Sequence, residues 1–215
     1  DAELKARGRA AYVDDMAEPG MLHAAVLRTA HPRARLVSLD VSAARALQGV
    51  VAVATAEDIP GKRFIGSVVP DWPTLVAVGE LTRCVGDAVA LVAAETPAIA
   101  RQALEMVRAH YEVLEPVRSP AEALADGAPL LHPGGNVLSR MSIRRGDAAA
   151  ALTASAHVVR ATFVTPFTDH AFMEPESALA YPPDDSGTVL VRTGEQNVYD
   201  GRRYVAETIG LPAEK

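Results

Sequence analysis

The sequence contains one cysteine, Cys84, in 215 residues. A single cysteine cannot form an internal disulfide, and alone it cannot hold an iron–sulfur cluster or a thiolate zinc site. Its neighbours in LTRCVGDAVALV are mostly apolar. This setting favours a buried, unreactive thiol.

Long apolar runs and clusters of basic residues are also missing. No run approaches the roughly 18 apolar residues that a membrane span needs, and no basic stretch followed by an apolar one opens the chain, so we expect a cytoplasmic protein. The net charge is −6, and Arg144-Arg145 and Arg202-Arg203 are only pairs. This balance argues against a nucleic-acid partner held by phosphate contacts. A length of 215 residues allows one large domain or two ordinary ones, and the 49% of hydrophobic residues can bury a core.

The clearest periodic pattern is a strand–helix–strand unit between residues 88 and 114. Ala88–Ala93 is a continuous apolar run, typical of a strand buried on both faces. Thr96-Pro97 predicts a helix start, and apolar residues then recur at helical spacing before a strand over Val107–Leu114. No glycine-rich turn lies between the first strand and the helix, so a dinucleotide-binding fold is excluded.

Shorter patterns predict the elements before this unit. Residues 35–41 alternate, which places Val37, Leu39 and Val41 on one face of a half-buried strand. Thr55 to Asp58 resembles a capping box and predicts a helical turn. Further strands are expected at Leu22–Arg28, Val50–Val53 and Leu75–Val78, and a short helix at Ser42–Leu47.

Proline and glycine are scattered over residues 115–147, which predicts a linker with a boundary near Gly146. Strands are then expected at His157–Val164 and Thr188–Arg192. A helix is expected over Tyr199–Thr208, with an Arg203–Glu207 pair outside and Gly210 as the stop signal.

Unusual polar residues gather between Phe163 and Gln196. On a helix, His170 and Glu174 would share a face and could bind a metal. However, Pro175 disfavours helix at Glu174, and no second His supplies a further ligand. Glu174 and Glu176 could form a general acid/base pair, or His170 and Glu174 could be structural residues that satisfy backbone groups in an irregular loop. Chemistry alone therefore indicates an α+β protein of two units with a polar loop.

Six segments add a family resemblance. They are GRAAYVDDMAEPGMLHAAVLRTAHPRARLVSLD, GVVAVATAEDIPG, CVGDAVALVAAET, HYEVLEPV, DHAFMEPESALA and TGEQNVYDGRRYVAETIGLPAEK, in this order along nearly the whole chain. The sequence resembles the N-terminal part of the molybdopterin-binding subunit of the xanthine dehydrogenase/aldehyde oxidase family of molybdenum hydroxylases. Within that family, HAFMEPE and EQNVYD look closest to bacterial selenium-dependent xanthine dehydrogenase-like proteins.

This resemblance implies an α/β-hammerhead domain over residues 1–118, a linker over 119–146, and the truncated start of a molybdopterin-binding domain over 147–215. It implies that Gln196 lies beside the molybdenum and hydrogen-bonds an oxo ligand, with no direct protein ligand to the metal. A neutral amide suits this role because it donates without replacing a ligand. His170 and Glu174 would shape the loop near the cofactor.

The resemblance also implies hydroxylation of an N-heterocycle such as a purine, or of an aldehyde, with oxygen from water. The cofactor would be molybdopterin, in the cytosine dinucleotide form, with molybdenum. Fe–S clusters and FAD would lie on other domains or subunits, and the complex could form a homodimer. The family's G-G-x-F-G-G segment and its C-terminal glutamate base are absent here, so we expect a fragment that is inactive alone. Two alternatives remain: a non-catalytic hammerhead module that binds partner subunits, and an acid/base enzyme that uses Glu174 and His170.

Overall fold

The computed structural model describes residues 2–215, and these residues group into two compact units. One unit comprises the residues up to Ser119 together with Glu174–Lys215, and the other comprises Pro120–Met173. Within residues 2–215, no helix is long and apolar enough to cross a membrane.

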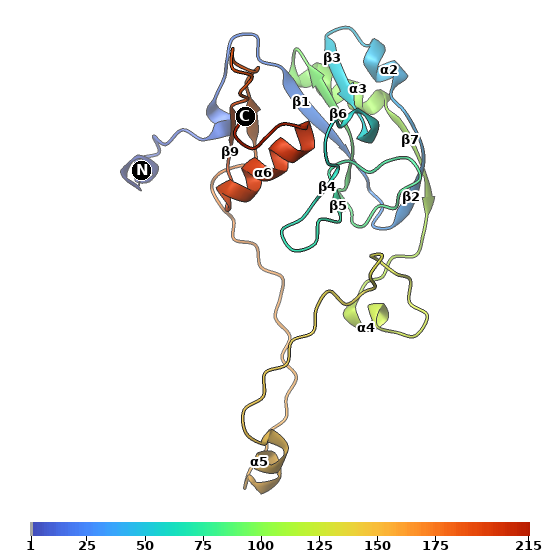
Figure 1. Ribbon diagram of the computed structural model, residues 1–215, viewed down its shortest axis with the longest axis vertical. Coiled ribbons are helices and arrows are strands. Elements are labelled where there is room, and N and C mark those ends of the chain that lie inside the picture. The colour runs from blue at the N-terminus through green and yellow to red at the C-terminus, as the bar shows by residue number, and fades with distance from the viewer. Residues whose placement is uncertain (1) are drawn as a thin grey trace. The chain divides into compact units, whose positions relative to one another are not determined.

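The first unit mixes short strands and helices (Figure 1). In chain order it contains α1 (Ala2–Ala6), the 3-10 turn η1 (Val13–Asp15), β1 (His23–Arg28), β2 (Ala34–Asp40), α2 (Ser42–Ala46), β3 (Val50–Ala54), the 3-10 turn η2 (Ala56–Asp58), β4 (Phe64–Ile65), β5 (Trp72–Pro73), β6 (Ala88–Ala94), α3 (Pro97–Met106), β7 (Arg108–Val113), β8 (Ala178–Ala180), β9 (Val191–Thr193) and α6 (Val198–Ile209).

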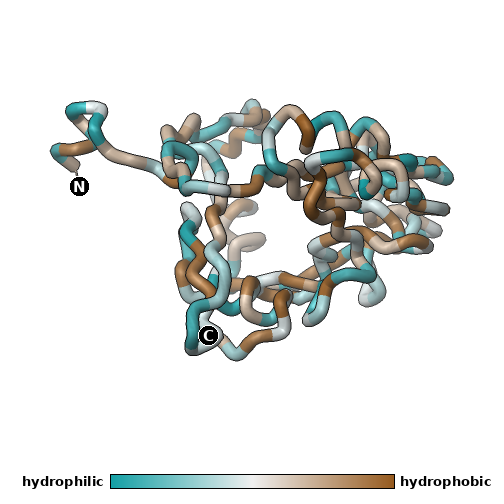
Figure 2. Tube along the Cα trace, turned by 90° about the horizontal axis from the view of Figure 1, so that it is seen from above, coloured by the Kyte–Doolittle hydropathy of each residue, from teal (hydrophilic) through white to brown (hydrophobic). Residues whose placement is uncertain are grey.

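The apolar run at residues 88–94 forms the central strand of this unit. β6 lies between β1 and β3 in a three-stranded antiparallel sheet. Val89 and Val92 are fully buried, whereas Leu91 is 38% exposed. The predicted strand is therefore confirmed, with one residue that reaches the surface. In Figure 2, apolar stretches of the trace (brown) run beside hydrophilic ones (teal), as expected for elements with one buried face.

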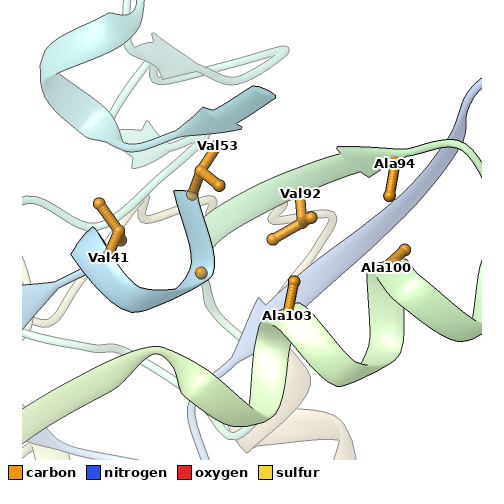
Figure 3. Packing of buried hydrophobic residues seen from close by; sticks show 7 residues of the cluster. Val41, Val53, Val92, Ala94, Ala100 and Ala103 are labelled. Carbon is orange, nitrogen blue, oxygen red and sulfur yellow. The ribbon is translucent and has the colours of Figure 1, made fainter. Parts of the chain in front are cut away.

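Helix α3 packs on this sheet through small residues. The Thr96 hydroxyl accepts a hydrogen bond from the Ile99 amide at 3.2 Å, so the predicted N-cap is confirmed. Figure 3 shows Ala100 and Ala103 of α3 directed towards Val92 and Ala94 of β6. The small side chains allow the helix to approach the sheet closely.

β2 pairs antiparallel with β7 in a second sheet, so β6 and β7, the two strands that flank α3, belong to different sheets. The pairing register shifts between Leu36 and Ser38. Leu36 is buried and Val37 is 53% exposed, so the predicted inward face was wrong at Val37. The irregularity breaks the strict alternation on which that prediction rested.

Two other predicted strands differ from the structure. Residues 75–78 form no strand, and Trp72–Pro73 instead pairs with Phe64–Ile65. The strand expected from Thr188 begins only at Val191, and its partner β8 was not predicted. Strands of two or three residues carry too little periodicity to be found from sequence.

Helix α6 confirms the predicted helix and its stop. Gly210 ends it with φ 73°, the left-handed conformation that glycine adopts most easily. The predicted Arg203–Glu207 pair is wrong. Arg203 Nη2 instead lies 2.8 Å from Asp200 Oδ1. Glu207 Oε1 lies 3.1 Å from the Nζ of Lys62, a residue far away in the sequence.

The second unit contains α4 (Pro120–Ala123) and α5 (Ala148–Ala154), which Asp147 caps by accepting from the Ala150 amide at 2.9 Å. The strand expected at residues 157–164 is absent, and these residues are exposed. Alternation makes a strand only where a neighbour completes the backbone hydrogen bonds, and no described residue does so here.

Cys84 is half-buried, and its thiol lies 3.3 Å from a carboxylate oxygen of the buried Asp87. Burial is the main cause that raises the pKa of this thiol, and the Asp87 carboxylate adds to it. A raised pKa lowers the thiolate fraction at neutral pH, in agreement with the predicted unreactive thiol.

Candidate functional site

Gln196 lies on the turn between β9 and α6. β9 ends at Thr193, and α6 begins after Asn197, whose side chain accepts from the Asp200 amide at 3.3 Å. Gln196 is exposed, and no residue of the described chain hydrogen-bonds its side chain. The amide is therefore free to donate to, or accept from, a bound group.

Glu174 lies against the same turn. A Cβ built on Gly194 would lie 3.2 Å from the Glu174 carboxyl carbon and 3.4 Å from both carboxylate oxygens. Glu174 is half-buried there. Glu174, a predicted site residue, thus lies beside the backbone of Gly194, two positions before Gln196. Gly194 has no side chain, which leaves room for the Glu174 carboxylate.

His170 belongs to the second unit, where it is exposed. The chain from residue 163 to 176 is not helical, so His170 and Glu174 do not share a helix face. Over residues 2–215, no three or more His, Cys, Asp or Glu side chains come together in a group that could hold a metal.

Ser177 was missed by the sequence argument. Its hydroxyl is buried and has no hydrogen-bond partner among residues 2–215. Its carbonyl accepts from the Thr193 hydroxyl at 3.1 Å, which ties it to the end of β9. A buried hydroxyl without a partner is costly and stands out as an available donor. The sequence carries no signal for it, because nothing local shows that Ser177 is buried.

A groove of about 350 Å³ runs between β9 and α6. Its lining is mostly apolar, with Thr193 and Glu195 at the turn. Its apolar residues include Val189, Leu190, Val191, Val198, Val205, Ala206, Ile209 and Leu211. Such a lining suits the packing of apolar groups rather than the binding of a metal ion.

The hairpin that carries the turn is anchored to the N-terminal part of its unit. The Tyr181 hydroxyl donates to a Glu18 carboxylate oxygen at 2.8 Å, and this bond raises the pKa of Tyr181. The Arg192 guanidinium lies 5.6 Å from the Tyr181 ring centre. These contacts hold β8 and β9, and with them the start of the Gln196 turn.

The available donors are the free neutral amide of Gln196, the buried hydroxyl of Ser177 and the exposed start of a helix. Backbone N–H groups at a helix start have no partner within the helix. Among the residues that the structure describes, this set contains no thiolate, imidazole or carboxylate cluster. It fits a cofactor that brings its own metal ligands and needs hydrogen-bond donors from the protein.

The fold is α+β, and Gln196 lies on a strand–turn–helix within the first unit. Residues 7–115 match the family model "Aldehyde oxidase and xanthine dehydrogenase, a/b hammerhead domain". Residues 131–215 match the model of the molybdopterin cofactor-binding domain. The chain therefore belongs to the aldehyde oxidase and xanthine dehydrogenase family.

Similar proteins agree with this assignment. The chain is 40% identical over its full length to a probable xanthine dehydrogenase subunit from Bacillus subtilis, of which it covers 28%. It is 37% identical over its full length to the nicotinate dehydrogenase large molybdopterin subunit from Eubacterium barkeri, of which it covers 50%. The chain thus spans half or less of the length of these relatives.

Solved structures show the same fold. The aldehyde oxidoreductase from Desulfovibrio gigas matches with a TM-score of 0.86 and 27% identity, over 99% of this chain and 25% of that one. The quinoline 2-oxidoreductase from Pseudomonas putida 86 matches with a TM-score of 0.83 and 31% identity, over 99% of this chain and 28% of that one.

Proposed function

We propose that this chain is the N-terminal region of the molybdopterin-binding part of a molybdenum hydroxylase. The observation that carries the proposal is the free, exposed amide of Gln196 on a turn within the region that matches the molybdopterin-binding model. When bound, the cofactor supplies the redox chemistry that hydroxylates a carbon atom with oxygen from water. The Gln196 amide donates a hydrogen bond to the bound group and orients it.

The substrate is an N-heterocycle such as a purine, or an aldehyde. The names of the similar proteins support this range, since they include xanthine, nicotinate, quinoline and aldehyde enzymes. The cofactor is molybdopterin in the cytosine dinucleotide form. Fe–S clusters and FAD would lie on other domains or subunits of a cytoplasmic complex.

Within the chain, we assign residues 1–118 to the hammerhead domain, 119–146 to a linker and 147–215 to the start of the molybdopterin-binding domain. Glu174 shapes the Gln196 turn through its contact with Gly194. His170 shapes the loop near the cofactor. The remaining molybdopterin-binding region completes the site, so the 215-residue chain is inactive alone.

The test uses the complete protein purified from its native source. We expect stoichiometric molybdenum, together with flavin and Fe–S absorbance, and a separate assay gives the selenium content. Gln196→Ala should lower kcat about 100-fold, the order expected for the loss of one oriented donor, while the molybdenum content is unchanged. Gln102→Ala is the control, because Gln102 is an exposed amide on α3.

Two results would overturn the proposal. A protein without molybdenum would exclude the cofactor role of the whole chain. A Gln196→Ala enzyme with full molybdenum and the kcat of Gln102→Ala would exclude the role of the Gln196 amide.

A further inference from the structure

The C-terminal end of α6 is capped by the loop around Gly61, which lies in the N-terminal segment of the same unit. The amide of Gly61 donates to the Thr208 carbonyl at 3.0 Å, and the amide of Lys62 donates to the Glu207 carbonyl at 2.7 Å. The last carbonyls of a helix have no partner within the helix. Two of them therefore receive their hydrogen bonds from the segment just before β4 (Figure 1).

Gly61 lies at the tightest point of this contact. A Cβ at this position would lie 2.0 Å from the Glu207 carbonyl oxygen, 2.7 Å from the Gly210 nitrogen and 2.9 Å from the Thr208 oxygen. All three are backbone atoms, so no side-chain rotation relieves the overlap. Only a glycine allows this close approach of loop and helix.

Side chains reinforce the contact. Lys62 Nζ lies 3.1 Å from Glu207 Oε1, and the Ser67 and Tyr204 hydroxyls lie 2.9 Å apart. The loop itself is held, because Arg63 donates to both carboxylate oxygens of Glu80 at 2.6 and 3.2 Å. The loop around Gly61 is thus held in place by side-chain contacts as well as by its backbone hydrogen bonds to α6.

We propose that the loop around Gly61 positions Gln196. The proposal rests on the proposed function. Helix α6 has 12 residues, a rod of about 18 Å, and its first residue follows Asn197, the neighbour of Gln196. The loop holds the far end of this rod, and the Tyr181–Glu18 hydrogen bond holds the hairpin on the other side of the turn. The position of the Gln196 amide is then set by two contacts with the hammerhead region, one at Gly61 and Lys62 and one at Glu18.

The test compares Gly61→Ala with Gly134→Ala in the complete, cofactor-loaded enzyme. Gly134 has open space around its Cβ position and no left-handed φ, so alanine fits there without strain. Hydrogen–deuterium exchange of the peptides covering residues 198–209 reports on α6 directly. The molybdenum(V) electron paramagnetic resonance spectrum reports on the surroundings of the metal.

We expect Gly61→Ala to speed exchange in α6, to change the molybdenum(V) spectrum, and to lower kcat roughly 10- to 100-fold with KM little changed, as a small displacement of a positioned group does. Gly134→Ala should match the wild type in all three. Faster exchange in α6 with an unchanged spectrum and kcat would overturn the positioning role, whereas a wild-type enzyme without molybdenum would instead overturn the proposed function.

Tyr204→Phe covers the case in which Gly61→Ala does not accumulate as folded protein. It removes only the hydroxyl that meets Ser67. A smaller change of the spectrum and of kcat in the same direction would support the proposal. A Tyr204→Phe enzyme identical to Gly134→Ala in spectrum and kcat would overturn it.

Discussion

Replacing Glu80 with glutamine should loosen the loop that caps α6. Glu80 accepts two hydrogen bonds from Arg63, and one of its oxygens also accepts from the Ala77 amide at 2.9 Å. The Arg63 and Glu80 side chains are 24% and 32% exposed, so water screens the pair only in part. Charge-assisted hydrogen bonds contribute about 1.5–3 kcal/mol each before screening. Because glutamine keeps the shape and one acceptor, we expect a loss of about 1–2 kcal/mol.

Hydrogen exchange measures this loss locally in the intact protein. A change of one or two kcal/mol in the opening free energy corresponds to a factor of roughly 5–30 in the exchange rate. The peptides that cover residues 61–80 should therefore exchange faster by that factor in Glu80→Gln. Glu105→Gln is the matched control: Glu105 is exposed on α3 and makes no ion pair with any described residue.

The same pair predicts a dependence on pH. The hydrogen bond from Arg63 is the main cause that holds the pKa of Glu80 below its ordinary value of 4.5, against the opposing effect of burial. A carboxyl whose pKa is lower in the folded state stabilises that state above its unfolded pKa, and the effect is lost as pH falls through the folded pKa. After correction for intrinsic rates, the loop of the wild type should open more easily below about pH 4.5. Equal exchange in Glu80→Gln and Glu105→Gln, or a wild-type loop that does not respond to acid, would refute this reasoning.

Two further predictions concern α3 and its contact with the sheet. Thr96→Ala removes the acceptor for the Ile99 amide, so the opening free energy of the first turn of α3 should fall by about 1 kcal/mol. Hydrogen exchange of residues 97–101 measures this loss. Equal exchange in Thr96→Ala and Thr96→Ser would contradict the prediction. Val92→Ala leaves a cavity where a fully buried side chain meets α3, so global stability should fall by about 1–3 kcal/mol. The denaturant midpoint of the hammerhead transition measures this loss, and a midpoint equal to that of Val51→Ala, a change at a 58% exposed residue, would contradict it.

The elements that could be predicted from sequence are those whose signals are local. Thr96-Pro97 starts α3, and Gly210 stops α6, because capping depends on groups within a few residues. Thr55 and Asp58 likewise form the predicted capping interaction, with the Thr55 amide 2.7 Å from the Asp58 carboxylate.

Features that depend on distant residues could not be predicted in this way. Glu207 pairs with Lys62, which is 145 positions away in the sequence, rather than with Arg203 on the neighbouring helical turn. The fold brings Lys62 closer to Glu207, and this proximity cannot be read from the helix alone. Residues 157–164 alternate like a strand but find no neighbour among the described residues. The bulge beside Val37 depends on the register with β7, which the sequence of one strand does not contain.

The candidate site shows the same division. The position of Gln196 before a helix followed from local pattern, and its role came from the family resemblance and stays a prediction. The contact of Glu174 with Gly194 joins residues 20 positions apart and needed the structure. The buried hydroxyl of Ser177 also became visible only there.

The capping of α6 by Gly61 and Lys62 has a consequence for biosynthesis. The strands β1, β2, β3, β6 and β7 and the helices that pack on them all lie before residue 114, whereas α6 begins at Val198. Domains generally fold from the N-terminus during synthesis. Helix α6 is therefore synthesised after every element of the surface that caps it, and its last turn can receive hydrogen bonds from Gly61 and Lys62 only once the second half of the chain has been made.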